Sequence, residues 1–367
     1  MQRREFLALL GTPAYAELAR RIGLQTAPDS PKADVTLRIS SVEIEVAPRR
    51  IIKTTGYNGS APGPVLRLRE GQPVTVEVLN DTKISEIIHW HGLFVPSEAD
   101  GSEEEGTPPV PPGGMRRYSF VPHPSGTRWY HSHVRAQRDM KRAMYTGQFG
   151  FLYIEPKEEP DQYDAEVLLA LHNSHALGSG EPVRVKEGQR VLFRILNASA
   201  TEQHRIALPG HRFKIVSLDG NAVPVPREVD TIEMGPAERV DSVVMMNQPG
   251  VWILGEANDQ IRNAGLGIVV EYANRSELPQ WTGRKLHGTT RFLDTMRRLP
   301  NRRAASCRST SVRNLPGTTG WITGPLTVNP SRRPIPFESV PATGTAFASI
   351  TKVMKRTQFT CTGTASN

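Results

Sequence analysis

The sequence predicts an all-β chain in which two tandem Greek-key β-sandwiches are followed by an irregular tail. Three observations predict this fold. Short segments that alternate apolar and polar residues are separated by turns rich in the 31 Gly and 30 Pro. The stretch 66–80 recurs in similar form at 183–197. Beyond residue 282 the alternation stops.

Length and composition indicate a globular protein of two or three domains. The chain has 367 residues, of which 38% are hydrophobic and 22% are charged. No apolar run approaches the roughly 20 residues that span a bilayer. We therefore expect no membrane-embedded segment.

The alternating segments occur in order along both halves of the chain. We expect strands at 35–46, 74–78, 117–121, 166–171, 191–196, 213–218, 240–245, 251–254 and 267–272. The only good helix candidate is 135–145.

The internal repeat predicts that the two sandwiches are copies of one design. Each copy has a strand, a Glu-Gly turn and a second strand that ends on Asn80 or Asn197. The offset between the copies matches the length of one sandwich. We predict a first domain at 33–156 and a second at 157–282.

The N-terminus, residues 1–32, is typical of an export signal and linker. Arg3-Arg4 precedes a short apolar run, and Ala14-Tyr15-Ala16 has the small-x-small form of a cleavage site. The pattern resembles a twin-arginine signal and predicts a periplasmic or exported protein. The alternative is a short amphipathic helix that continues through 16–22.

Two pairs of histidines carry the chemistry of the first domain. The pairs are His89-x-His91 and His131-x-His133, each in a strand-like context with aromatic neighbours. Residues i and i+2 of a strand share a face, so two such strands bring four imidazoles within reach of a metal. A single pair of this kind is often only a half-exposed polar face, but two in one domain favour metal binding.

The residue types narrow the choice of metal but do not identify it. Calcium and magnesium prefer oxygen ligands, and the lack of nearby thiolates disfavours a structural zinc site. Copper, zinc, iron and nickel all accept imidazoles. Five other histidines are interpreted as structural or solvated: His123, His172, His175, His204 and His211. The acidic stretch 100–105 is interpreted as a solvated loop.

The two histidine motifs resemble the N-terminal copper motifs of the multicopper oxidases. The similar stretches are 89–93 (HWHGL), 126–133 (GTRWYHSH) and 145–151 (YTGQFGF). The resemblance covers about residues 33–282. It implies cupredoxin-like sandwiches, the first two of three domains.

The family resemblance also implies roles for the four histidines. His89 would bind the type 2 copper, and His91, His131 and His133 would bind the type 3 pair. In that family a type 1 copper takes electrons from a phenolic, metal or similar reductant, and the copper cluster reduces dioxygen to water. The implied partners are therefore a small-molecule or metal-ion reductant and dioxygen, with no nucleic acid and no membrane.

The third domain is where this chain departs from the family. It should supply H-x-x-H-x-H and H-C-H motifs, yet the only histidine after His211 is His287. The chain as written has half of the cluster ligands and no type 1 site.

A basic tail, 283–367, stands in place of that domain. It carries 14 Lys and Arg and only two acids, so the rest of the chain has a net charge of −4 within a total of +8. Both cysteines, Cys307 and Cys361, also lie there. Nucleic-acid binding is one interpretation of this charge.

The interpretation that we favour is a shift of reading frame near Thr282. Back-translating 356–367 and reading one base earlier permits HPVHLHRHRFE, which has the form of the missing third-domain motif. On this hypothesis the basic charge is accidental. We expect the tail to be irregular and poorly ordered, because it has no evolved core.

The leading functional hypothesis is a laccase-like or copper-tolerance-type oxidoreductase in incomplete form. The first alternative is a non-enzymatic periplasmic copper-binding protein, which the truncated ligand set would permit. A second alternative is a two-domain enzyme of the nitrite-reductase type. That enzyme would need a cysteine ligand within 33–282, where the sequence has none.

Overall fold

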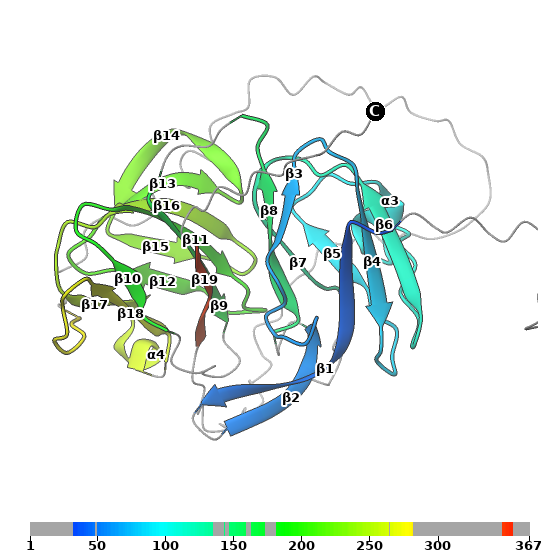
Figure 1. Ribbon diagram of the computed structural model, residues 1–367, viewed down its shortest axis with the longest axis horizontal. Coiled ribbons are helices and arrows are strands. Elements are labelled where there is room, and N and C mark those ends of the chain that lie inside the picture. Colours follow the sequence, from blue (N-terminus) through cyan, green and yellow to red (C-terminus); the bar gives the residue numbers. More distant parts are fainter. Residues whose placement is uncertain are drawn as a thin grey trace, which may run out of the picture.

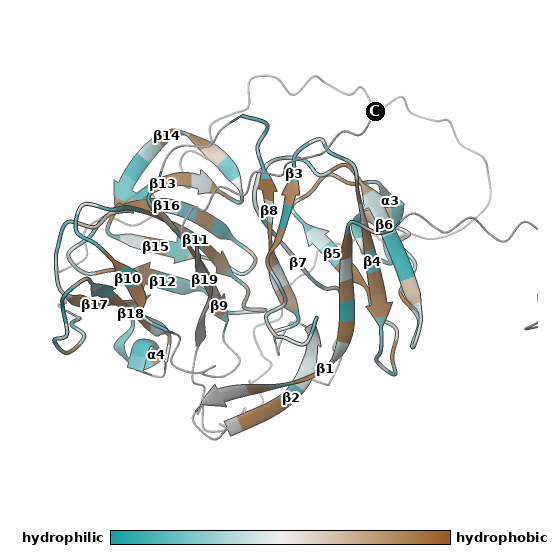
Figure 2. Cartoon of the chain, in the orientation of Figure 1, coloured by the Kyte–Doolittle hydropathy of each residue, from teal (hydrophilic) through white to brown (hydrophobic). Residues whose placement is uncertain are grey.

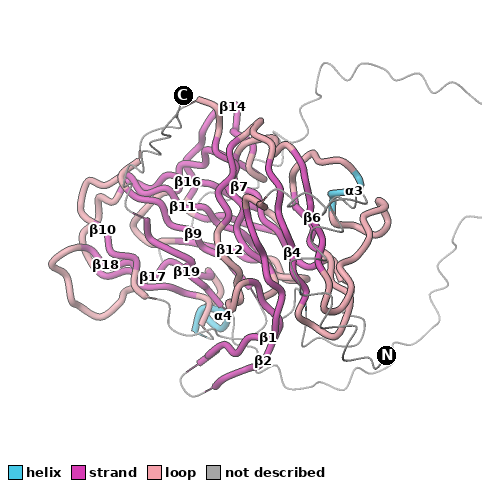
Figure 3. The backbone as a smooth tube through the Cα atoms, turned by 45° about the vertical axis from the view of Figure 1, so that its right-hand side comes forward, coloured by secondary structure: helices cyan, strands magenta, loops and turns pink. Residues whose placement is uncertain are grey.

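The computed structural model describes residues 32–47, 50–134, 143, 147–158, 163–172, 181–263, 265–281 and 347–354. Its elements are nearly all β-strands, as the sequence predicted (Figure 1). Figure 3 shows two short helices among them, α3 (Ser97–Asp100) and α4 (Asp259–Asn263). The predicted helix at 135–145, apart from Ala143, and the predicted signal, apart from its last residue, lie outside the described residues.

Eight strands form the first sandwich. They are β1 (Val35–Ala47), β2 (Arg50–Tyr57), β3 (Leu66–Arg69), β4 (Val74–Asn80), β5 (Ile88–His91), β6 (Met115–Phe120), β7 (Gly126–Ser132) and β8 (Phe149–Glu155). One sheet has the order β2-β1-β4-β6 and the other β3-β8-β7-β5. Each sheet combines one parallel pair with two antiparallel pairs, so strands distant in sequence become neighbours.

The alternation of apolar residues explains the core of this sandwich. In β4 the valines at 74, 76 and 78 are buried, and the residues between them are half-buried. They join one apolar cluster with residues of both sheets, including Trp90 of β5. Figure 2 shows the hydrophobic residues as brown segments along these strands. Because neighbours along a strand face opposite ways, His89 and His91 lie on the other face of β5.

Eleven strands form the second sandwich. They are β9 (Ala165–His172), β10 (Val183–Val185), β11 (Arg190–Asn197), β12 (His204–Ala207), β13 (Phe213–Leu218), β14 (Asn221–Val229), β15 (Thr231–Met234), β16 (Arg239–Met245), β17 (Val251–Glu256), β18 (Gly267–Tyr272) and β19 (Phe347–Met354). The two sheets have the orders β10-β18-β17-β12-β15 and β14-β13-β16-β11-β9-β19. A single large cluster of buried aliphatic and aromatic side chains lies between them.

The internal repeat corresponds to β3–β4 in one sandwich and β10–β11 in the other. Each turn contains a left-handed glycine, Gly71 at φ +77° and Gly188 at φ +79°. Asn80 and Asn197, which end the second strands, are completely buried. Each side-chain amide donates to loop carbonyls, and each side-chain oxygen accepts from the backbone N–H two residues later, at 2.9 and 3.0 Å. The repeat therefore preserves the same strand ending in both sandwiches.

An apolar contact joins the two sandwiches. Its buried residues are Trp129, Phe149 and Phe151 from the first sandwich and Leu168, Ala170, Leu196 and Ala198 from the second. Because the aromatic side chains come from β7 and β8, the strand that carries His131 packs directly against the second sandwich.

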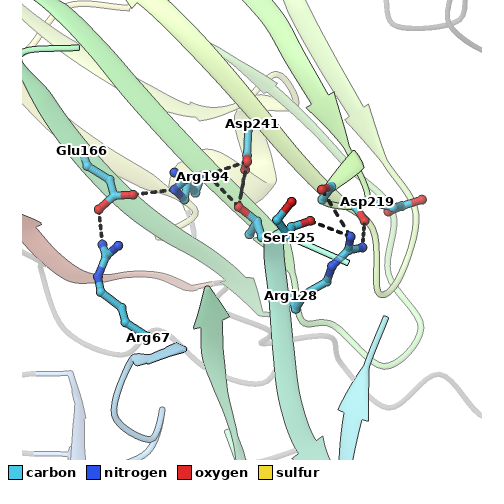
Figure 4. Close-up of polar contacts among 9 residues, drawn as sticks. Arg67, Ser125, Arg128, Glu166, Arg194, Asp219 and Asp241 are labelled. Atoms are coloured by element: carbon cyan, nitrogen blue, oxygen red, sulfur yellow. Dashed lines mark hydrogen bonds and ion pairs between the residues drawn. The ribbon is translucent and has the colours of Figure 1, made fainter. Parts of the chain in front are cut away.

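Beside this contact lies a chain of buried ion pairs (Figure 4). Glu166 accepts from Arg67 of the first sandwich and from Arg194. Arg194 also donates to Asp241 at 2.6 Å, and Asp241 accepts from the hydroxyl of Thr127 at 2.7 Å. Burial alone would lower the pKa of Arg194, but Asp241 and Glu166 raise it, so this guanidinium stays charged.

Part of the tail belongs to the second sandwich. β19 pairs antiparallel with β9 and extends its sheet at the edge. The remaining tail residues, 283–346 and 355–367, lie outside the described residues, so the structure describes little of the segment that we predict to be out of frame. Within the described part of the chain, no helix has the length and apolar character needed to cross a membrane.

Candidate metal centre

The four histidines of the two motifs meet at one end of the β5–β7 pair. In the antiparallel register His89 lies opposite His131, and His91 lies opposite Trp129. Directly opposite residues share a face, so this register gathers the imidazoles on the outer side of the sheet. His133 follows β7, and its backbone N–H donates to the carbonyl of Ile87 at 3.1 Å. This bond keeps His133 beside the end of β5.

Ring geometry places all four imidazoles in one cluster. One nitrogen from each of His89, His91 and His131 lies within 4.8 Å of the other two. The His133 ring centroid is 5.3 Å from that of His89 and 5.9 Å from that of His131. The sequence predicted this convergence. That these residues bind a metal stays a prediction.

Hydrogen bonds orient two of the rings. The Nδ1 of His89 lies 2.9 Å from the backbone oxygen of Asp100, and the Nδ1 of His131 lies 2.9 Å from that of Ser132. With Nδ1 donating, each ring keeps the lone pair of its Nε2 for a ligand bond. The Nε2 of His131 lies 3.4 Å from the Nδ1 of His91. His91 therefore faces the cluster with its Nδ1, whereas His131 faces it with its Nε2.

The environment of His91 and His131 favours their neutral forms. Burial, followed by the charge of Arg239, lowers the pKa of His91 to about 3. Burial also holds the pKa of His131 well below its ordinary value. A neutral imidazole has a free lone pair at physiological pH, so no proton has to leave before a metal is bound.

Trp129 forms one wall of the cluster. Its ring centroid lies 4.3 Å from that of His131 and 5.1 Å from that of His91, and its side chain is 1% exposed. His131 is also buried, whereas His133 is exposed. The cluster is therefore dry on the side of Trp129 and open to solvent on the side of His133.

Asp100 is the residue that sequence reasoning missed. The acidic stretch 100–105 was expected to be a solvated loop, but Asp100 ends α3 against His89. Besides its backbone oxygen, its carboxylate Oδ2 lies 3.3 Å from the same His89 nitrogen. Nothing in the spacing signals this contact, because it depends on how the loop folds back onto β5.

The other histidines of the described residues are not part of the cluster. His204 and His211 are buried in the second sandwich, where they contact Ser199 and Tyr272. His123 is exposed beside Phe94. His172 was expected in a loop but ends β9, where it is buried and stacks on Phe149. His175 and His287 lie outside the described residues.

The donor set fits a transition metal. The three nitrogens that converge come from imidazoles, and the carboxylate of Asp100 faces the outer nitrogen of His89. Hard cations that require oxygen ligands do not fit this set, whereas copper does. The same chemistry also accepts zinc, iron or nickel.

Comparison with known proteins gives consistent matches. Two family models, both described as multicopper oxidase, match residues 39–159 and 127–272. The chain is 30% identical over 251 residues to multicopper oxidase MmcO of Mycobacterium tuberculosis, covering 53% of this chain and 48% of that protein. It is 25% identical over 323 residues to copper resistance protein A of Pseudomonas syringae pv. tomato, covering 68% and 52%. The chain thus spans about half the length of these curated relatives.

Solved structures share the fold. The blue copper oxidase from Nitrosomonas europaea superimposes with a TM-score of 0.58 at 27% identity. That match covers 65% of this chain and 85% of the other.

Proposed function

The chain belongs to the multicopper oxidase family, and we propose that it is a copper-dependent oxidase in incomplete form. The reaction would couple one-electron oxidation of a phenolic, metal or similar reductant to reduction of dioxygen to water. The observation that carries this proposal is the pair of facing H-x-H motifs, with nitrogens of His89, His91 and His131 within 4.8 Å of one another.

Copper is the cofactor of this family, and the four histidines are the residues that would hold it. By family resemblance His89 would serve the type 2 centre, and His91, His131 and His133 the type 3 pair. Bound copper would supply single-electron transfer and the reduction of dioxygen. The chain contributes rings with fixed nitrogens: His89 is oriented by the backbone oxygen of Asp100, and His131 by the Ser132 carbonyl.

The second sandwich would support the site without providing a ligand. Its histidines at 204 and 211 are engaged within its own core. A type 1 centre would need a cysteine, and both cysteines lie in the tail. Residues 33–282 thus contain no candidate for that ligand, and we propose that the tail, 283–367, is out of frame where the family has its third domain.

A non-enzymatic copper-binding protein is the second candidate. The half set of cluster ligands favours it, because electrons would have no type 1 centre through which to enter. For either function we propose export to the periplasm, which is supported by Arg3-Arg4 and the apolar run that follows.

Dioxygen uptake separates the two candidates. The full chain, loaded with copper and desalted, is supplied with a substituted phenol or with Cu(I) in an oxygen-electrode cell. An oxidase consumes one dioxygen for every four electrons delivered and releases no peroxide. A His131→Ala variant should consume no dioxygen under the same conditions. Bound copper without turnover would support the binding protein, and a chain that takes up no copper would contradict both.

A further inference from the structure

Two buried arginines, Arg128 and Arg239, lie beside the backbone that follows His91. The next residue, Gly92, has φ +87°, and a Cβ built on it would lie 2.8 Å from Nη2 of Arg239 and 3.4 Å from Nη1 of Arg128. Arg128 belongs to β7 of the first sandwich and Arg239 to β16 of the second. The two guanidinium groups therefore lie directly against the backbone that positions His91.

Backbone carbonyls hold most of the donors of these arginines. Arg128 donates to the carbonyls of Asp219, Ser125 and Gly220 and to the side chain of Asn221 (Figure 4). Arg239 donates to Ala237 O at 2.7 Å and to Asp219 O at 3.0 Å. Carbonyl groups are neutral dipoles, so they fix the position of each guanidinium without cancelling its charge.

The nearby charges leave a positive field on the side of His91. Arg67 and Arg194 are matched by Glu166 and Asp241 in the neighbouring chain of ion pairs. Arg239, 5% exposed, lies 3.6 Å from the Asp219 carboxylate, which is 36% exposed.

Asp219, Asp241 and Glu70 are the acids that act on Arg128. Asp241 is buried and already paired with Arg194. Asp219 and Glu70 are half-buried, so solvent screens these two charges more strongly than those of the buried arginines. Of all these charges, that of Arg239 acts most strongly on His91.

We propose that Arg239 and Arg128 are positioning residues whose positive charges act on the metal centre at His91. They would thereby favour binding of Cu(I) over Cu(II). A nearby fixed positive charge repels the doubly charged ion more than the singly charged one. The second sandwich would then tune the metal centre through Arg239 without ligating it. This inference rests on the proposed copper site.

The test compares two substitutions that change the local charge in opposite directions. Arg239→Gln removes a positive charge, and Asp219→Asn removes the negative charge beside it. Asparagine tolerates the left-handed backbone of Asp219, at φ +49°. Arg205→Gln is the control, because Arg205 makes a half-exposed ion pair on β12, with Glu233.

The readout is the ratio of Cu(I) affinity to Cu(II) affinity for the full chain. Cu(I) affinity is measured by competition with bicinchoninate, and Cu(II) affinity by competition with nitrilotriacetate. We expect Arg239→Gln to lower the ratio by about three- to tenfold and Asp219→Asn to raise it. Arg205→Gln should leave it unchanged.

A purely structural role would weaken both affinities together and leave the ratio fixed. An unchanged ratio in folded Arg239→Gln, or a shift of the same sign in both variants, would overturn the inference while leaving the copper site intact. If Arg239→Gln does not fold, the sign of the shift in Asp219→Asn decides. A parent chain that binds neither ion would overturn the proposed function, and this inference with it.

Discussion

At the residue scale, the metal centre depends on a glycine that lets two backbones touch. Gly101 follows α3 with φ +86°, and a Cβ on it would lie 1.7 Å from the carbonyl oxygen of Ile88 and 2.6 Å from the Cα of His89. No side chain fits between this turn and the edge of β5. The same close approach brings Asp100 to the His89 ring.

Gly101→Ala should therefore lower the free energy of unfolding far more than an alanine substitution at a similar turn does. Gly106 is the matched control, because it lies in the same loop at φ +95° with nothing within 4 Å of its Cβ. Both variants incur the strain of a left-handed alanine, about 1 kcal/mol. Only Gly101→Ala adds a backbone clash, so we expect it to lower the free energy of unfolding by about 3 kcal/mol or more. Urea denaturation measures both, and equal losses would contradict the close contact.

Residue periodicity predicted the histidines but not their supports. The i, i+2 spacing alone is enough to place His89 and His91 on one face, because strand geometry is local. Asp100 and Arg239 reach the site through a loop and through the other sandwich. Such contacts depend on tertiary structure and leave no local pattern in the sequence.

At the element scale, a set of buried ion pairs in the second sandwich reaches the first sandwich through Arg67, which pairs with Glu166, and through Thr127, which donates to Asp241. Arg194 lies between Glu166 and Asp241 with a side chain 6% exposed. Removing one member of a buried ion pair leaves an uncompensated charge, which is strongly destabilising.

We expect Arg194→Met to lower the free energy of unfolding by about 3–5 kcal/mol. Arg38→Met is the control, because Arg38 also pairs with a carboxylate, Asp81, but is 52% exposed. Arg38→Met should lower the free energy of unfolding by less than about 1 kcal/mol. Chemical denaturation of the two variants checks this, and similar losses would show that the buried pairs stabilise the protein no more than an exposed pair does.

Several strands with one buried face were predicted from the sequence, although the buried strands β8 and β15 were not. The predicted segments 213–218 and 267–272 coincide with β13 and β18. β14 was not predicted, because it is mostly exposed and contains Pro224 and Pro226. Proline is tolerated there because β14 is an edge strand that pairs only with β13.

At the scale of the whole molecule, the tail, 283–367, is the part of the chain that departs from the family pattern. Its composition differs sharply from the rest of the chain, and only β19 in it is described. We predict that sequencing the gene from the Gln280 codon past the stop codon will reveal a one-base shift. The corrected frame should encode an H-C-H motif downstream. A gene whose alternative frames all lack that motif would contradict the frame shift and leave the tail as a genuine product.

The most direct test of the central claim is the copper that the full chain retains after loading and desalting. His131 is the residue to change, because its ring lies within 6 Å of the other three, at 5.3, 5.6 and 5.9 Å between centroids. The control is His123→Ala, an exposed histidine outside the cluster. We predict that the parent and His123→Ala retain copper and that folded His131→Ala loses most of it. A parent without copper, or a His131→Ala variant that retains as much as the parent, would contradict the assignment of these histidines as the copper site.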